Sequence, residues 1–194
     1  MRAGGGKAKG GQFERDMARK LSLWLTDGKK DDCLWRSAGS GSMSTNSIKR
    51  GTGAKQYQAS DLSPNAPEAY LLLDRFTIEC KYYANLQLDG LLFNPKCQLL
   101  TFWKQSNRDA ASVSKRPFLI AKQNRRPIMV GIEIEVLAKI GKVPTMISVV
   151  HANLALVLLD DFLQHIKPTD LNWMAPNNAT PRPARQRLAL NRKP

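Results

Sequence analysis

The feature that most constrains the fold is an alternating run near the middle of the chain. Residues 76–82 read FTIECKY, in which apolar and polar side chains take turns. A period of two is typical of a half-buried strand. Glu79 and Lys81 then leave the same face of that strand, about 7 Å apart along the chain. This pair forms either an ordinary ion pair or one part of an active site.

The surrounding sequence has the order of an α/β domain with a mixed sheet. Apolar residues spaced three and four apart predict a helix over residues 12–26. Asn94 and Pro95 are typical of a helix start and predict a second helix as far as residue 114. Residues 67–74 fit either a helical turn or an extra strand. Strands are expected over residues 33–36, 57–62, 76–83, 117–122, 127–136 and 145–150, and a last short helix from residue 160 or 161.

The charge balance indicates a polyanionic partner. The chain has 30 Lys and Arg against 16 Asp and Glu, a formal charge of +14. Residues 1–11 and 171–194 are basic and rich in Gly or Pro, so we expect a flexible arm and a disordered tail around a single domain over residues 12–170. Basic ends of this kind bind nucleic-acid phosphates without reading sequence, and an anionic membrane surface is the competing partner.

A second unusual segment is the loop at residues 37–56, SAGSGSMSTNSIKRGTGAKQ. Gly, Ser, Thr and Asn dominate it, and Lys49, Arg50 and Lys55 are its charged residues. We expect a mobile loop with a functional role, because long loops inside compact domains are often functional. A plain disordered insertion is the alternative.

The cysteines argue against a zinc site and a secreted protein. Cys33, Cys80 and Cys97 are widely spaced, no C-x-x-C occurs, and the chain has two histidines. The sequence starts without a secretory leader and contains no apolar run long enough to span a bilayer. We therefore expect a cytoplasmic protein with no membrane partner.

Carboxylates from separate elements suggest metal-ion chemistry. Glu14 lies on the first predicted helix, Asp61 at a strand end and Glu79 on the alternating strand. Converging carboxylates suit Mg²⁺, which can activate a water for phosphodiester hydrolysis. Lys81 would orient that water or stabilise the transition state, and the general base is either the water network or Lys81 with a lowered pKa. Asp74 is the alternative to Asp61, although it is only five residues before Glu79 and its reach is awkward.

The order of these residues resembles the PD-(D/E)xK nuclease superfamily. The elements that carry the resemblance are G-x-F-E-R at residues 11–15, R-S-x-G-S-G at 36–41, S-D-L at 60–62 and I-E-C-K at 78–81. Within the superfamily the layout is most similar to Holliday-junction resolvases of archaeal and phage type, over about residues 10–123. Ser60 stands where that family usually has proline.

The resemblance implies a restriction-endonuclease-like core, with a central mixed β-sheet flanked by helices. It implies that Asp61, Glu79 and the backbone carbonyl of Cys80 bind Mg²⁺, or Mn²⁺ in its place, with Glu14 as an outer carboxylate. Lys81 would be the catalytic lysine. The side chain of Cys80 faces away from Glu79 and Lys81 and is expected in the core.

The resemblance also implies contacts to DNA. Ser40 or Ser42 would approach the scissile strand and contribute to catalysis, and Arg36 would contact a phosphate. Further candidate DNA contacts are Arg15, Lys49, Arg50 and Lys55. The family acts as a homodimer on branched DNA, which suits phage DNA recombination.

Two other functions compete with a junction resolvase. One is a non-catalytic, basic nucleic-acid-binding protein in which Glu79 and Lys81 form a structural ion pair. The other is a nuclease of the same superfamily that cuts linear, flap or RNA substrates. Glu133 and Glu135 alternate with isoleucines and are expected on the solvent side of the 127–136 strand, not in a second acidic site.

Overall fold

The computed structural model describes residues 5–37, 59–91, 94, 96–141, 146–149 and 152–174. In chain order its elements are α1 (Gly5–Leu25), β1 (Leu34–Arg36), β2 (Leu62–Pro64), η1 (Pro67–Ala69), α3 (Tyr70–Leu73), β3 (Phe76–Tyr83), η2 (Leu88–Leu91), α4 (Gln98–Ser112), β4 (Arg116–Gln123), β5 (Ile128–Glu133), α5 (Ile134–Ile140), β6 (Met146–Val149), β7 (Leu154–Leu158), α6 (Leu159–His165) and η4 (Pro168–Leu171). No helix in this part of the chain is long and apolar enough to cross a bilayer.

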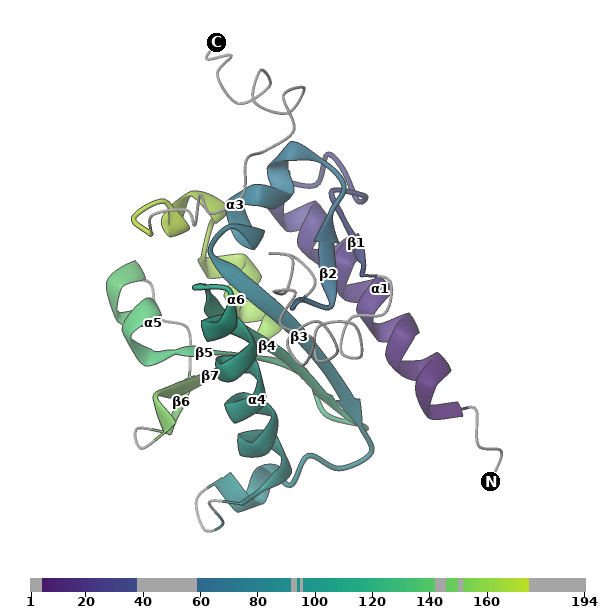
Figure 1. Cartoon of the computed structure of the whole chain (residues 1–194), viewed down its shortest axis with the longest axis vertical. Helices are drawn as coiled ribbons and strands as arrows, with labels where there is room; N and C mark the ends of the chain where they lie inside the picture. Colours follow the sequence, from purple (N-terminus) through teal and green to yellow (C-terminus); the bar gives the residue numbers. More distant parts are fainter. Residues whose placement is uncertain are drawn as a thin grey trace.

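The central sheet has five strands in the order β3-β4-β5-β7-β6. β3 and β4 run parallel, and the other neighbours are antiparallel. β3 is therefore an edge strand of this sheet. A separate antiparallel ribbon of β1 and β2 lies between α1 and the outer edge of β3 (Figure 1). The backbone N–H of Asp61 donates to the carbonyl of Ile78 at 2.8 Å and connects ribbon to sheet.

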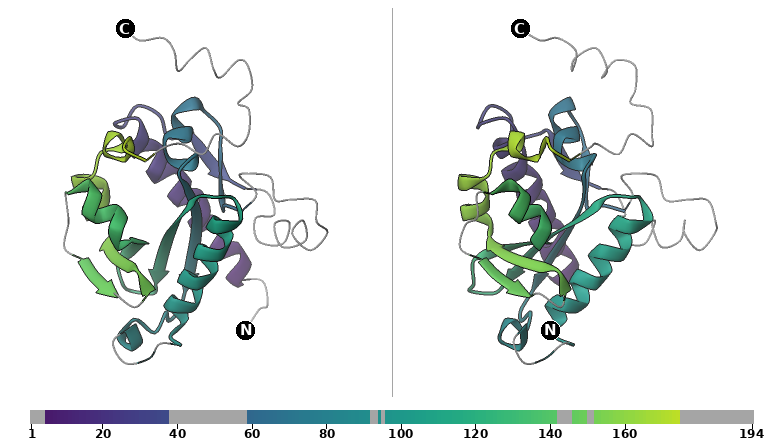
Figure 2. Two further views of the ribbon diagram at one scale, coloured as in Figure 1. Left: turned by 60° about the vertical axis from the view of Figure 1, so that its left-hand side comes forward. Right: turned by 90° about the vertical axis from the view of Figure 1, so that its left-hand side faces the viewer.

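Helices cover both faces of the sheet, which gives three layers (Figure 2). On one face, Leu21 of α1 packs in the same apolar core as Ile78 and Phe118. On the other face, Trp103 of α4 packs in a second core with Leu119. Because successive side chains of a strand point to opposite faces, β4 contributes to both cores, whereas the apolar side chains of β3 lie in the core beneath α1. The predicted mixed α/β fold with flanking helices is confirmed.

Helix α1 is longer than the sequence predicted. It begins at Gly5, so residues 5–11 are helical where a flexible arm was expected. Lys9 explains part of this difference, because its ammonium donates to Asn124 Oδ1 at 2.7 Å and lies 3.7 Å from the ring centroid of Tyr82. These tertiary contacts hold a turn that is too polar to be recognised from periodicity.

The predicted strand over residues 127–136 is wrong in its second half. β5 ends at Glu133, and α5 runs from Ile134 to Ile140 and is followed by Gly141, which has a left-handed φ of 70°. Glu133 is half-buried and binds Arg116 of β4 at 2.5 Å, whereas Glu135 lies in the first turn of α5. The alternation of Ile and Glu therefore continued past the end of the strand.

Three smaller differences concern element ends. α4 starts at Gln98 and not at Asn94, since the Asn94 side chain accepts from the N–H of Lys96 while Gln87 Oε1 accepts from the N–H of Gln98. β7 was not predicted, and β2 begins at Leu62, where the expected strand ended. The ambiguous segment at residues 67–74 is helical, as η1 and α3.

Candidate active site

Glu79 and Lys81 lie on the α4 face of β3. The parallel register places Glu79 beside Leu119 and Lys81 beside Ala121, and both β4 residues belong to the core beneath α4. Cys80 points the other way and packs in the core beneath α1, as the alternation predicted. Glu79 is buried and forms an ion pair with Lys81, which is partly buried.

Asp61 is fixed at the outer edge of β3 by hydrogen bonds to the main chain. Its Oδ2 accepts from the backbone N–H of Cys80 at 2.8 Å, and its own N–H donates to Ile78. Its carbonyl accepts from the N–H of Ser37 at 2.8 Å, directly after β1. The Asp61 carboxylate is thus held one residue away from Glu79 along the edge of the strand.

The hydroxyl of Ser60 fixes the bend that presents Asp61. It donates to the carbonyl of Ile78 at 3.2 Å and accepts from the N–H groups of Ile78 and Leu62 at 3.1 and 3.3 Å. Ser60 is almost fully buried. A proline at this position would supply none of these bonds, so serine replaces the stiffness of proline with side-chain hydrogen bonds to β3.

Two carboxylates share one ammonium group at this site. Burial raises the pKa of Glu79, the charge of Asp61 raises it further, and Lys81 opposes both effects, with a net pKa of about 7. Burial lowers the pKa of Lys81, but the negative charges of Glu79 and Asp61 outweigh burial and leave that pKa above its ordinary value. Lys81 therefore keeps its proton at neutral pH in the metal-free protein.

Helix α4 adds two polar side chains that the sequence did not reveal. Gln105 Nε2 donates to Glu79 Oε1 at 3.5 Å, and Gln105 also hydrogen-bonds with Asp109 one turn later. Burial raises the pKa of Asp109, while Gln105, Arg108 and Lys81 oppose that effect. The i, i+4 spacing shows that both lie on one helix face, but nothing in the sequence indicates that this face covers β3.

Glu14 lies apart from the pair of acidic residues. It projects from α1, near the Cys80 side of β3, and forms an ion pair with Arg36. Gly11 permits this contact, because a Cβ at that position would lie 3.4 Å from the Arg36 guanidinium carbon. Among the residues described, no three His, Cys, Asp or Glu side chains are grouped closely enough to hold a metal ion. The structure therefore brings together Asp61 and Glu79 without Glu14.

Asp74, the alternative to Asp61, lies at the other end of β3. It follows α3 and interacts with Lys115, whose pKa is lowered by burial to about 8 in spite of the Asp74 charge. β3 begins at Phe76, after Asp74, and Glu79 is three residues farther along it, about 10 Å at about 3.3 Å per residue. Asp61 is the aspartate beside Glu79.

The predicted DNA contacts are only partly described. Arg15 is exposed on α1 and donates to Oε1 of Gln12 at 2.9 and 3.3 Å. Arg36 binds Glu14, as above. Ser40, Ser42, Lys49, Arg50 and Lys55 lie outside the described residues.

The donor set of this site fits a hard divalent cation. Asp61 and Glu79 leave an excess of negative charge over Lys81, which a bound cation would relieve. Because the N–H of Cys80 points to Asp61 at the outer edge of β3, its carbonyl leaves the strand on the same edge. Two carboxylates and one carbonyl, with waters completing the shell, suit Mg²⁺. The Cys80 thiol, buried on the opposite face, does not contribute.

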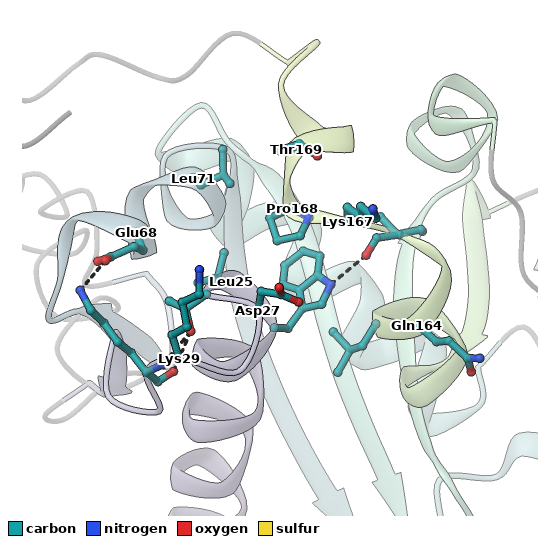
Figure 3. A pocket seen from close by; sticks show the side chains of 14 residues that line it. Leu25, Asp27, Lys29, Glu68, Leu71, Gln164, Lys167, Pro168 and Thr169 are labelled. Atoms are coloured by element: carbon teal, nitrogen blue, oxygen red, sulfur yellow. Dashed lines mark hydrogen bonds and ion pairs between the residues drawn. The ribbon is translucent and has the colours of Figure 1, made fainter. Parts of the chain in front are cut away.

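A hollow of about 640 Å³ lies at the end of α1, and none of the residues above lines it (Figure 3). Glu68 on one wall binds Lys30 at 2.5 Å. The indole of Trp24 donates to the carbonyl of Ile166 at 2.8 Å. These polar groups are paired with each other over largely apolar walls, so the hollow presents no catalytic set.

Comparison with known proteins gives one match. Residues 5–172 match the family described as "Phage putative PDDEXK endonuclease". The chain belongs to this family. Membership in the PDDEXK family indicates a nuclease that acts on nucleic acid, and such nucleases generally use divalent metal ions. No curated protein and no solved structure matches the chain.

Proposed function

We propose that this PDDEXK protein is a Mg²⁺-dependent DNA endonuclease that hydrolyses phosphodiester bonds in four-way branched DNA, as a homodimer. The observation that carries the proposal is the pairing of Asp61 and Glu79 at the outer edge of β3, with Lys81 beside them. This is the order of the motif that resembles junction resolvases. The formal charge of +14 supports a polyanionic substrate.

In this proposal Asp61, Glu79 and the Cys80 carbonyl hold the metal ion. The bound ion would polarise the scissile phosphate and lower the pKa of an attacking water. Lys81, protonated at neutral pH, would place a fixed positive charge beside the phosphate as its negative charge grows in the transition state. Gln105 would keep the Glu79 carboxylate in place from α4. The proton of the attacking water would leave through solvent.

The substrate is tested with a set of DNA forms. Purified protein is incubated with Mg²⁺ and a four-way junction, a flap, a single strand or a linear duplex of matched sequence. We expect symmetrical nicking of the junction in preference to the other forms. Equal cutting of linear duplex, or cutting of flaps alone, would contradict the junction specificity and leave a nuclease with another substrate.

A further inference from the structure

Trp35 is an exposed aromatic residue close to the candidate active site. Of the large hydrophobic side chains that are exposed in the described residues, Trp35 is the most exposed, at 57 %. A single exposed apolar side chain is ordinary on a protein surface. Trp35 differs from that ordinary case in three respects: its rigid backbone, the charges around it and its distance from Asp61.

The backbone under Trp35 is firmly held. Its neighbours Cys33 and Leu34 are almost fully buried, and the N–H of Leu34 donates to the buried hydroxyl of Ser22 at 2.9 Å. Trp35 is paired with Ser63 in the ribbon of β1 and β2. An exposed indole on a fixed strand loses little conformational entropy when a flat ligand binds, which favours its use as a contact surface.

The surroundings of Trp35 are hollowed and contain three arginines and two aspartates. A groove of about 390 Å³ between α1 and β1 is lined by Arg15, Ala18, Arg19, Asp31, Asp32, Leu34, Trp35, Arg36 and Asn65. Within the described residues, the hydrogen-bond partner of Arg15 is the neutral side chain of Gln12, so its charge is not neutralised there. Arg19 pairs with Asp31 at 3.0 Å, but both side chains are largely exposed, and such pairs are weak enough to exchange for a phosphate.

The groove also lies next to the acidic pair. Leu34 and Leu62 pack in the core beneath α1, whereas Trp35 is exposed and its partner Ser63 is half-buried. Ser63 precedes Pro64 on β2 and is two residues from Asp61. The backbones of Trp35 and Ser63 are about 5 Å apart across the ribbon, and Ser63 is two residues, about 7 Å, from Asp61. A DNA strand cut at Asp61 and Glu79 therefore passes within reach of the indole.

We propose that this groove binds an unpaired nucleotide of the DNA substrate, with its base stacked on Trp35 and the flanking phosphates bound by Arg15 and Arg19. Every base has a flat π-face, so stacking selects unpaired nucleotides without reading their sequence, and arginines provide the phosphate contacts. Flaps and bulged junctions carry unpaired bases, an open four-way junction exposes the faces of its paired bases where the arms meet, and a continuous duplex offers neither. The proposal rests on DNA as the substrate, as argued above, and adds a physical reason for a preference for DNA with unpaired nucleotides over continuous duplex.

The test measures binding, so that it does not depend on cleavage. The full chain with Asp61→Asn, which leaves the DNA uncut, is titrated with a duplex and with the same duplex carrying one unpaired nucleotide. Trp35→Ala and Trp35→Phe are made in this background. Trp173→Ala is the matched control, because Trp173 is also exposed, at 39 %, but contacts Lys139 and does not line the groove.

We expect Trp35→Ala to weaken binding of the unpaired DNA about 5- to 150-fold and binding of the duplex less than about 2-fold. Trp35→Phe should retain most of the affinity, and Trp173→Ala should change neither. Equal loss on both DNAs, or no loss on either, would overturn the stacking site while leaving the nuclease proposal to the cleavage assay. If the parent protein binds no DNA at all, both proposals fail together.

Discussion

Lys81 and Glu79 are two residues apart, and the structure sets their charges in different ways. Glu79 is buried beside Asp61 and takes up a proton more readily than an ordinary glutamate, whereas Lys81 holds its proton more firmly than an ordinary lysine. One consequence is chemical: the lysine contributes charge and the glutamate contributes a ligand. The other consequence is that the cleavage rate should depend on pH through the ionisation of Glu79.

We predict that cleavage rises with pH as Glu79 loses its proton. The ordinary pKa of 4.5 is raised to about 7, so below pH 7 most of the metal-free protein carries a neutral Glu79 that binds cations poorly. Metal binding competes with the proton, so the pH of half-maximal activity should fall as the Mg²⁺ concentration is increased. Initial cleavage rates between pH 5.5 and 8.5 at several Mg²⁺ concentrations check this. A rate that is flat over this range, or a midpoint that ignores Mg²⁺, would contradict the ligand role of Glu79.

At the residue scale, the sequence predicted a side chain's position where that position depends on neighbouring residues in the chain. Alternation placed Glu79 and Lys81 on one face, and the awkward reach of Asp74, only five residues before Glu79, favoured Asp61. Gln105 and Asp109 could not be found in this way, because their role depends on which face of α4 covers β3. The pairing of Glu14 with Arg36 is likewise a tertiary contact between α1 and β1.

At the scale of elements, the site depends on how the β1–β2 ribbon is joined to β3. The junction consists of the hydrogen bond from the Asp61 N–H to the Ile78 carbonyl, the hydrogen bond from the Cys80 N–H to the Asp61 carboxylate, and two hydrogen bonds between the Ser60 hydroxyl and Ile78. The strands and helices of the two cores were largely predictable from their apolar periodicity. The ends of elements were not, since Glu133 and Asn94 follow local sequence patterns that a tertiary contact overrides.

We predict that Ser60→Ala lowers cleavage more than its effect on stability explains. The change leaves the N–H of Ile78 without its side-chain acceptor and should cost about 1–3 kcal/mol of unfolding free energy, measured by urea denaturation. Loosening the bend also moves Asp61 relative to Glu79, so we expect cleavage to fall at least about 10-fold at a temperature where the variant is folded.

Ser22→Ala is the matched control for this change. Ser22 is also buried, and its hydroxyl donates to the carbonyl of Ala18 at 2.7 Å and accepts from the N–H of Leu34. It should lose similar stability without a comparable loss of cleavage. Similar loss of activity in both variants would mean that Ser60 acts on stability alone.

At the scale of the whole molecule, the family match and the net positive charge both point to a nucleic-acid substrate. Residues 5–172 match the phage PDDEXK endonuclease family, and the chain carries a net charge of +14. The Trp35 groove and the acidic pair lie on connected elements, the ribbon and the edge of β3 (Figure 1). The α/β class followed from the order of elements in the sequence. The position of the ribbon at the β3 edge did not, because it depends on tertiary hydrogen bonds of Ser60 and Asp61, such as the one between Asp61 and Cys80, which are 19 residues apart.

The central claim is that Asp61 and Glu79 hold the metal ion that cleavage requires. The most direct measurement is single-turnover cleavage of four-way junction DNA with Mg²⁺, by the wild-type chain and by Asp61→Asn, with DNA affinity measured in parallel. The account predicts cutting that a chelator abolishes, and a loss of at least about 100-fold in Asp61→Asn, since losing a direct ligand should exceed the 10–100-fold typical of outer partners. DNA affinity should change little. Cleavage by Asp61→Asn at the wild-type rate, or equal loss of cleavage and binding, would contradict it.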